Sequence, residues 1–296
     1  MKNTTKSAIF ALITVLVWSS AFPITKYASS AFSPNVLGLL RCGVASVILL
    51  VIGFFNRIKV PKKLSHLPLF FLCGAFGFGL YMIFFNSGML TMSSAGSSLI
   101  IATAPVLTAI GAFLFYREGI KPLGWCAIAT AFLGVSVLFV SDIAKGGLGG
   151  ASGILWIMAA AVAFCCYNLM TRKLLSLGYS AMECVTWSMV CGTVLLLPFL
   201  PEAVGQIGDA SATAILAAVY LGAMPSAISH LFWNAAMALA IKTSDVANYQ
   251  FLTPLFSTVM GFAILGEVPG PLTVLGGLII LVSIVVFARG GKQAKR

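Results

Sequence analysis

The sequence has little charge, and acidic residues are especially scarce. Only 8% of its 296 residues are charged while 60% are hydrophobic, and 18 Lys and Arg stand against 7 Asp and Glu, a formal charge of +11. Soluble domains carry about 25% charged residues, and nucleic-acid-binding proteins place their basic residues on a water-facing surface. A mean hydropathy of +1.05 leaves almost no such surface. The composition therefore predicts an integral membrane protein with the lipid bilayer as its surroundings and no nucleic-acid partner.

Metal-binding and catalytic motifs are also lacking. The seven cysteines are an odd number, lie within or beside apolar stretches, and include no Cys-x-x-Cys spacing. No His-Glu-x-x-His, Gly-x-Ser-x-Gly or P-loop motif occurs, and Asp, Glu and His form no cluster along the sequence. We therefore expect buried thiols that pack as small hydrophobic groups, with no metal, no cofactor and no catalytic residues. A membrane-embedded enzyme is kept only as a remote alternative.

Long apolar runs fill most of the sequence. A helix needs about 20 apolar residues to cross a bilayer, and runs free of Asp, Glu, Lys and Arg recur along the chain, interrupted internally only by Arg41. The first run is expected to stay as a helix, because it is long and lacks the cleavage site of a signal sequence. We predict an all-α protein with ten transmembrane helices near residues 7–25, 35–56, 67–90, 95–116, 122–141, 146–171, 184–201, 210–241, 246–266 and 268–288.

The distribution of basic residues predicts an orientation. If the N-terminus is cytoplasmic, the loops after even-numbered helices and the C-terminus are cytoplasmic too, and that side collects 15 of the 18 Lys and Arg. Lys26 and Lys145 fall on the other side, and Arg41 falls within a helix. Because cytoplasmic loops of membrane proteins are enriched in Lys and Arg, we predict that both termini are cytoplasmic.

Residues of the first half recur in the second half at a nearly fixed spacing. An offset of 149 aligns Pro105 with Pro254, Phe113 with Phe262, Glu118 with Glu267, Pro122 with Pro271 and Leu123 with Leu272, and an offset of 148 aligns Gly74 with Gly222, Phe84 with Phe232, Asn86 with Asn234 and Met89 with Met237. Each copy holds five helices, an odd number, so the second copy enters the membrane from the opposite face. We predict two inverted five-helix repeats, residues 1–145 and residues 146–296 with a basic C-terminal tail. This architecture is typical of transporters that expose one central site alternately to each side.

The residues that carry a family resemblance lie in both repeats. They are Trp18-Ser19-Ser20-Ala21-Phe22 and Arg41 in the first, and Trp233-Asn234, Pro254, Gly266-Glu267, Pro271-Leu272 and Gly276-Gly277 in the second. With them, residues 7–288 resemble the EamA-type transporters of the drug/metabolite transporter superfamily. The resemblance implies a ten-helix exporter of amino acids or similar small metabolites in a prokaryotic inner or plasma membrane, acting without ATP hydrolysis. We expect the protein to be a monomer or a homodimer. Another cargo on the same fold stays open: a drug or organic cation, a purine, a lipid carrier or a nucleotide sugar.

Arg41 is the leading candidate for a substrate-binding residue. It lies seven residues after Pro34, about 10 Å along its predicted helix. Ionisable residues inside a span face a cavity or a partner, and a guanidinium binds a carboxylate with two parallel hydrogen bonds. An amino acid or organic acid would suit it. The alternative is a structural arginine that extends its head to the interface or bonds to backbone carbonyls.

Other candidates are polar, aromatic or proline residues inside the predicted helices. His230 has a side chain that titrates near neutral pH and could carry a coupling proton, or it could be a neutral packed imidazole. Asn86 and Asn234 could bind substrate or bond helix to helix. Pro105 and Pro254 would each kink a helix and serve as hinges. The aromatic residues that could line a site for amphipathic or aromatic substrates are Trp18, Phe22, Tyr81, Tyr167, Trp187, Trp233 and Tyr249.

Overall fold

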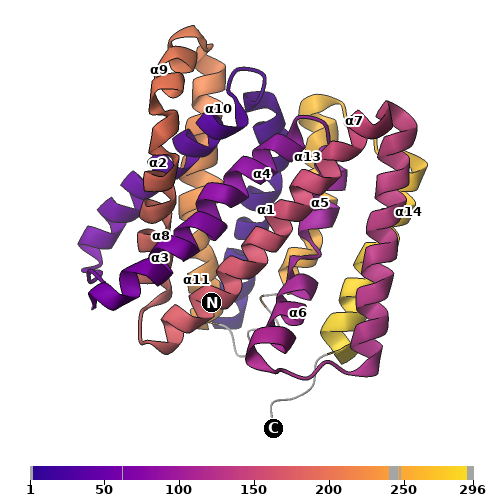
Figure 1. Ribbon diagram of the computed structural model, residues 1–296, viewed down its shortest axis with the longest axis horizontal. Helices are drawn as coiled ribbons and strands as arrows, with labels where there is room; N and C mark the ends of the chain where they lie inside the picture. The colour runs from indigo at the N-terminus through magenta and orange to yellow at the C-terminus, as the bar shows by residue number, and fades with distance from the viewer. Residues whose placement is uncertain (1–2, 62, 240–245, 247, 292–296) are drawn as a thin grey trace.

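The apolar segments of the sequence form helices in the computed structural model of the chain (Figure 1). The structure describes residues 3–61, 63–239, 246 and 248–291. Among these residues, nine helical segments are long and apolar enough to cross a bilayer, and a shorter apolar helix, Tyr249–Leu265, adds a tenth. The predicted all-helical membrane fold is thereby confirmed. Of the cations used to predict the orientation, Lys2, Lys62, Lys242, Lys292, Lys295 and Arg296 lie outside the described residues.

The first four spans run from Asn3 to Tyr116, and serine side chains cap the start of the second and of the fourth. They consist of α1 (Asn3–Ala28); α2 (Pro34–Phe55); η1 (Leu64–His66), α3 (Leu67–Gly74), η2 (Ala75–Gly79) and α4 (Leu80–Met89); and α5 (Ser94–Ile101) with α6 (Ala104–Tyr116). The Ser33 side chain accepts the Val36 N–H at the start of α2, and Ser93 accepts the Gly96 N–H at the start of α5. Such caps satisfy N–H groups that have no partner within the helix.

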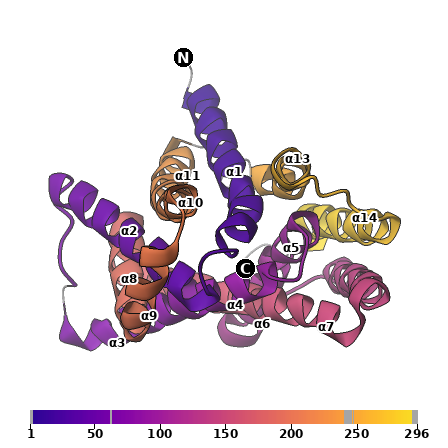
Figure 2. The ribbon, with the colours of Figure 1, turned by 90° about the horizontal axis from the view of Figure 1, so that it is seen from above.

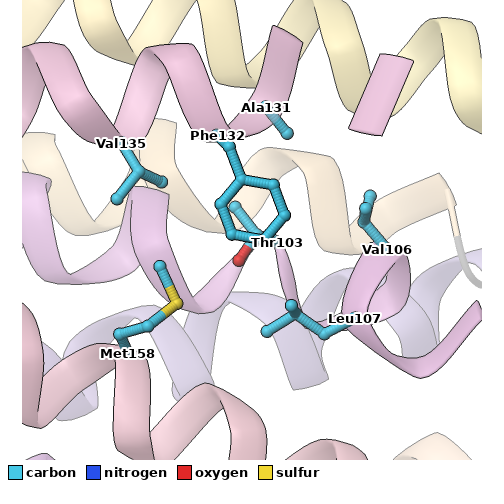
Figure 3. A pocket seen from close by; sticks show the side chains of 7 residues that line it. All are labelled: Thr103, Val106, Leu107, Ala131, Phe132, Val135 and Met158. Atoms are coloured by element: carbon cyan, nitrogen blue, oxygen red, sulfur yellow. The ribbon is translucent and has the colours of Figure 1, made fainter. Parts of the chain in front are cut away.

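Helix α7 (Pro122–Ser176) contains two spans, Pro122–Val140 and Ser152–Ser176. A straight helix of its 55 residues would be about 80 Å long, more than twice the roughly 30 Å of a bilayer core. Figure 1 shows the ribbon turning back at its upper end, from where the second span descends away from the first. A narrow apolar crevice is lined by Phe132 from the first span and by Met158 from the second (Figure 3).

The remaining spans alternate in direction across the bundle. They consist of α8 (Ala181–Leu196), η3 (Leu197–Phe199) and α9 (Leu200–Asp209); α10 (Ala212–Ala223), η4 (Met224–Ile228) and α11 (Ser229–Leu239); η5 (Asn248–Leu252) and α13 (Thr253–Leu265); and α14 (Pro271–Val286) with η6 (Phe287–Gly291). In Figure 1 the connection between α9 and α10 lies at the upper end, and α14 runs down toward the lower end. Figure 2 shows α1 between α11 and α13, so the first helix packs against helices from the far end of the chain.

The two prolines predicted as hinges lie where helices restart. Helix α5 ends at Ile101 and α6 begins at Ala104, with Pro105 in its first turn. Likewise η5 ends at Leu252, and Pro254 lies in the first turn of α13. Proline suits this position because its missing N–H would have had no helical partner there. The expected kink within one helix is therefore a break between two helical segments, and the hinge role remains a prediction.

Backbone features recur at the spacing found in the sequence. The π-helical turns η2 and η4 begin at Ala75 and Met224, which are 149 residues apart. Helices α6 and α13 start and end with the same offset, and each is followed by a residue with positive φ, Arg117 at 54° and Gly266 at 67°. The two halves of the chain thus share local backbone geometry as well as residue identities.

Small residues set the distance between α7 and α14, which lie next to each other in Figure 2. A Cβ added at Gly134 would lie 2.6 Å from Cγ1 of Ile280 and 2.9 Å from the carbonyl oxygen of Gly276. Glycine lets the two backbones approach this closely, as at many helix contacts within membranes. Close packing of α7 against α14 therefore depends on Gly134 having no side chain.

We expect Gly134→Ala to lower the free energy of unfolding by about 1–3 kcal/mol, because the added methyl group overpacks the contact between α7 and α14. The measurement is thermal unfolding of the purified protein in detergent. Gly205→Ala in α9 is the matched control, since a Cβ there meets nothing within 4 Å. A Gly134→Ala protein as stable as the Gly205→Ala protein would contradict this account.

Candidate functional site

A continuous chain of aromatic rings runs through the interior of the bundle. In order of contact its members are Phe22, Phe85, Tyr81, Phe164, Tyr167, Phe78, His230, Trp18 and Trp233. The centroids of successive rings are between 5.2 and 6.2 Å apart, within or near the range of favourable ring pairs. We call this set the aromatic chain. It joins α1, η2 and α4 to α7 and α11, so it takes rings from both halves of the protein.

Helical spacing brings these rings onto the inner faces of their helices. Phe78 and Phe85 lie three and four positions from Tyr81, and Phe164 lies three positions from Tyr167. Residues at these intervals share one face of a helix. The sequence reasoning predicted the two tyrosines and missed the three phenylalanines, because nothing in their identity separates them from the other Phe among the chain's 22. Their spacing from the predicted residues was the signal that could have found them.

Arg41 lies beside one end of the aromatic chain. Its Cζ atom is 5.7 Å from the centroid of the Phe85 ring, and the residue is 3% exposed. Nη1 donates hydrogen bonds to Oγ1 of Thr25 at 3.1 Å and to Oδ1 of Asn86 at 3.3 Å. The guanidinium therefore does not extend to the surface. It is held between α1, α2 and α4 by two uncharged side chains.

The hydrogen-bonding capacity of this guanidinium is not exhausted. Its Nε is buried and has no hydrogen-bond partner among the described residues, although buried polar groups nearly always have one. The second Asn86 contact, from Nδ2 to the Pro34 carbonyl at 3.0 Å, orients the amide so that its oxygen faces Arg41. Since a guanidinium has five N–H donors, Arg41 retains donor capacity that Thr25 and Asn86 do not use.

The π-helical turns lie against the aromatic chain. Pro225 in η4 has no N–H, so the Leu221 carbonyl lacks its helical donor, and the Ser226 hydroxyl donates to that carbonyl at 2.9 Å. The Pro225 carbonyl in turn accepts a hydrogen bond from Nε1 of Trp18 at 3.1 Å. In η2, the Tyr167 ring packs directly onto Gly77, where a Cβ would overlap it. Such turns are frequent at functional sites.

Three other predicted residues lie outside the aromatic chain. Trp187 donates from Nε1 to the carbonyl of Lys59 at 2.9 Å, which ties α8 to the segment that follows α2. Tyr249 packs with Trp233 in a small cluster around Ala11. Asn234 is half-buried next to Trp233 on α11.

The carboxylate side chains that the structure describes, which exclude those of Asp142 and Asp245, lie at or just after the ends of helices. Glu118 and Glu267 each form an ion pair, Glu183 belongs to the capping box of α8, and Glu202 and Asp209 lie in α9. Among the described residues, no group of three or more His, Cys, Asp or Glu side chains could hold a metal ion. The interior site therefore combines one cation with aromatic rings and uncharged polar groups.

Comparison with known proteins gives the chain a family. The model of the EamA-like transporter family matches residues 5–140 and 151–289. A solved crystal structure superposes with a TM-score of 0.63, covering 95% of this chain and 96% of the other at 17% sequence identity, so it supports the fold alone.

Curated relatives are similar along nearly their whole length. A probable terminal-alkyne amino-acid exporter of Streptantibioticus cattleyicolor is 34% identical, over 95% of this chain and 93% of that protein. An uncharacterized transporter of Bacillus subtilis is 30% identical, over 94% and 89% of the two chains. A probable amino-acid metabolite efflux pump of Salmonella typhimurium is 26% identical, over 95% and 94%.

Asn86→Ala should lower the free energy of unfolding by about 1.5–3 kcal/mol, because it removes a hydrogen-bond acceptor from a buried charged donor. Asn56→Ala is the control and should change it by less than about 0.5 kcal/mol, since Asn56 is exposed and its amide donates to the Ile52 carbonyl at the same helix end. Thermal unfolding in detergent compares the two. Equal stability of both variants would show that Asn86 does not support Arg41.

Proposed function

The chain belongs to the EamA-like transporter family, and on this premise we propose that it exports amino acids or closely related small metabolites. Membership makes it a multi-pass membrane transporter of small molecules and not an enzyme. The names of two relatives, an amino-acid exporter and an amino-acid metabolite efflux pump, support the substrate class. The observation that carries the proposal is the buried guanidinium of Arg41, with an unpartnered Nε, beside a chain of aromatic rings.

Arg41 would bind the substrate carboxylate. A carboxylate that approaches the guanidinium can accept from Nε and from a terminal nitrogen in the paired geometry that arginine favours. The neighbouring Phe22, Tyr81 and Phe85 rings then offer an apolar surface for the substrate side chain. Thr25 and Asn86 are uncharged, so the substrate would not compete with a protein carboxylate for the cation.

Transport would follow from movement of the two inverted halves, residues 1–145 and 146–296, around this site. The breaks before Pro105 and Pro254 lie at equivalent points of the two halves and supply positions where the segments can change angle. We place both termini in the cytoplasm, on the basis of the distribution of Lys and Arg. The membrane would be the plasma membrane of a prokaryote, with the protein a monomer or homodimer.

We propose that transport proceeds by exchange or facilitated diffusion. Proton-coupled carriers use ionisable side chains within the membrane, whereas the described carboxylates here lie at helix ends. His230 packs edge-on against Trp18 and Phe78, as a member of the aromatic chain. This surrounding supports a packing role for the imidazole and leaves proton antiport as the alternative mechanism.

We expect Arg41→Lys and Arg41→Ala each to reduce transport by about tenfold or more, since a charged hydrogen bond is worth about 1.5–3 kcal/mol. Lysine keeps the charge but loses the paired geometry. Exposed Arg57, which follows the C-terminal end of α2, provides the control, and Arg57→Lys should transport at the wild-type rate. Wild-type flux in both Arg41 variants would remove Arg41 from the site.

Counterflow in proteoliposomes tests the substrate class. Vesicles preloaded with an unlabelled amino acid should take up the same amino acid in labelled form. Vesicles preloaded with a purine or an organic cation should not take up the labelled form of that compound. Arg41→Ala and protein-free vesicles provide the controls. Uptake driven by purines or organic cations and not by amino acids would replace the proposed substrate while leaving the family assignment in place.

A further inference from the structure

Two ion pairs join the halves of the protein. Nζ of Lys26, in the last turn of α1, lies 2.6 Å from Oε1 of Glu267, which follows α13. Nη2 of Arg172, near the end of α7, lies 2.7 Å from Oε1 of Glu118, which follows α6. Each pair therefore connects the first helix of one half to the residue after the fourth span of the other half.

The two pairs are related by the repeat. Glu118 and Glu267 are 149 residues apart, each follows a residue with positive φ, and each donates its N–H at 3.2 Å to a carbonyl at an equivalent position, Ala112 or Gly261. Their basic partners, Lys26 and Arg172, occupy corresponding ends of the first and sixth spans. An inverted repeat places equivalent points at opposite faces of the membrane. In Figure 1, α1 runs to the upper end of the bundle and α7 ends at the lower end.

Additional bonds tie each pair to the surrounding helices. Lys26 also donates to the Met92 carbonyl at 3.1 Å, and Oε2 of Glu267 accepts the Ser94 N–H at the start of α5 at 2.8 Å. This pair therefore draws α1, α5 and α13 together at one end of the bundle.

At the other end, the guanidinium of Arg172 lies 4.4 Å from the centroid of the Tyr116 ring. The Tyr116 hydroxyl donates to the Leu169 carbonyl at 2.8 Å. This pair therefore joins α6 to the second span of α7.

We propose that these pairs are the two gates of the transport cycle, each closing one mouth of the central site. Both are formed in this structure, as an occluded state requires. Opening one mouth separates α1 from Glu267, and opening the other separates α7 from Glu118. The side chains are partly exposed, 33% and 16% for Lys26 and Glu267 and 40% and 37% for Arg172 and Glu118. Ion pairs with this access to water are weak enough to break in every cycle.

The gates are tested by the accessibility of a reporter, which needs no knowledge of the substrate. A protein without its native cysteines carries Trp18→Cys in the aromatic chain, and membrane-impermeant thiol reagents are applied from either side. Glu267→Gln should accelerate labelling from the side of Lys26 about two- to fivefold and slow it from the opposite side. Glu118→Gln should have the reverse effect, because weakening either pair shifts the population toward the state in which that mouth is open.

Matched controls separate gating from a general effect of charge. Asp209→Asn changes an exposed acid near the Lys26 end, and Lys173→Met changes the exposed neighbour of Arg172. Both should leave labelling unchanged. The exchanged pair Lys26→Glu with Glu267→Lys should restore the labelling of the reporter protein. If Trp18→Cys does not fold, Phe22→Cys serves as the reporter.

Unchanged labelling in both glutamine variants, or a shift toward the same side in both, would overturn the proposal. The inference rests on the proposed movement of the two halves around the central site and not on the substrate class, so loss of the amino-acid proposal in the counterflow test would leave it standing. Conversely, a failed gate test would leave the role of Arg41 intact.

Discussion

The cost of leaving a backbone polar group without a partner in hydrocarbon governs this structure. Lipid offers no hydrogen bonds, so a chain that crosses the membrane must satisfy its N–H and C=O groups internally. Helices meet that demand everywhere except at their ends and breaks, and there the sequence supplies substitutes. Ser33 and Ser93 cap helix starts, the Ser226 hydroxyl replaces the N–H that Pro225 lacks, and Pro105 begins a helix where its missing N–H does no harm.

Hydropathy alone located the helices, because the length of an apolar run and the thickness of a bilayer are tied by simple geometry. The second predicted span, 35–56, differs from Pro34–Phe55 by one residue at each end. The break between Ile101 and Ala104 could not be read from hydropathy, since a broken span is as apolar as a continuous one. Of the site, the sequence predicted Arg41 and most of the aromatic chain from residue type. Phe78, Phe85 and Phe164 were missed because residue type alone does not distinguish them from phenylalanines that face lipid, and their helical spacing from Tyr81 and Tyr167 was not used.

The two repeats share a backbone arrangement, but equivalent positions in them can carry side chains of different charge. Helices α2 and α8 both begin after a capping serine, Ser33 and Ser180, and counting from these caps aligns Arg41 with Ser188. One half therefore contributes a buried cation where the other contributes a buried hydroxyl. A ligand bound between the halves would accordingly have a defined orientation, with its anionic end toward α2.

The partners of α1 also constrain how the protein is made. The first helix bonds from Ser7 to the Ala236 carbonyl and from Lys26 to Glu267, residues 229 and 241 positions later in the chain. During synthesis α1 enters the membrane long before these partners exist. Until the second half is inserted, the polar side chains Ser7 and Lys26 of α1 are surrounded by the translocation machinery or by lipid. The contacts of α1 with α11 and α13 can therefore form only after most of the second half has been made, and a chain that stops early leaves the first helix without these neighbours.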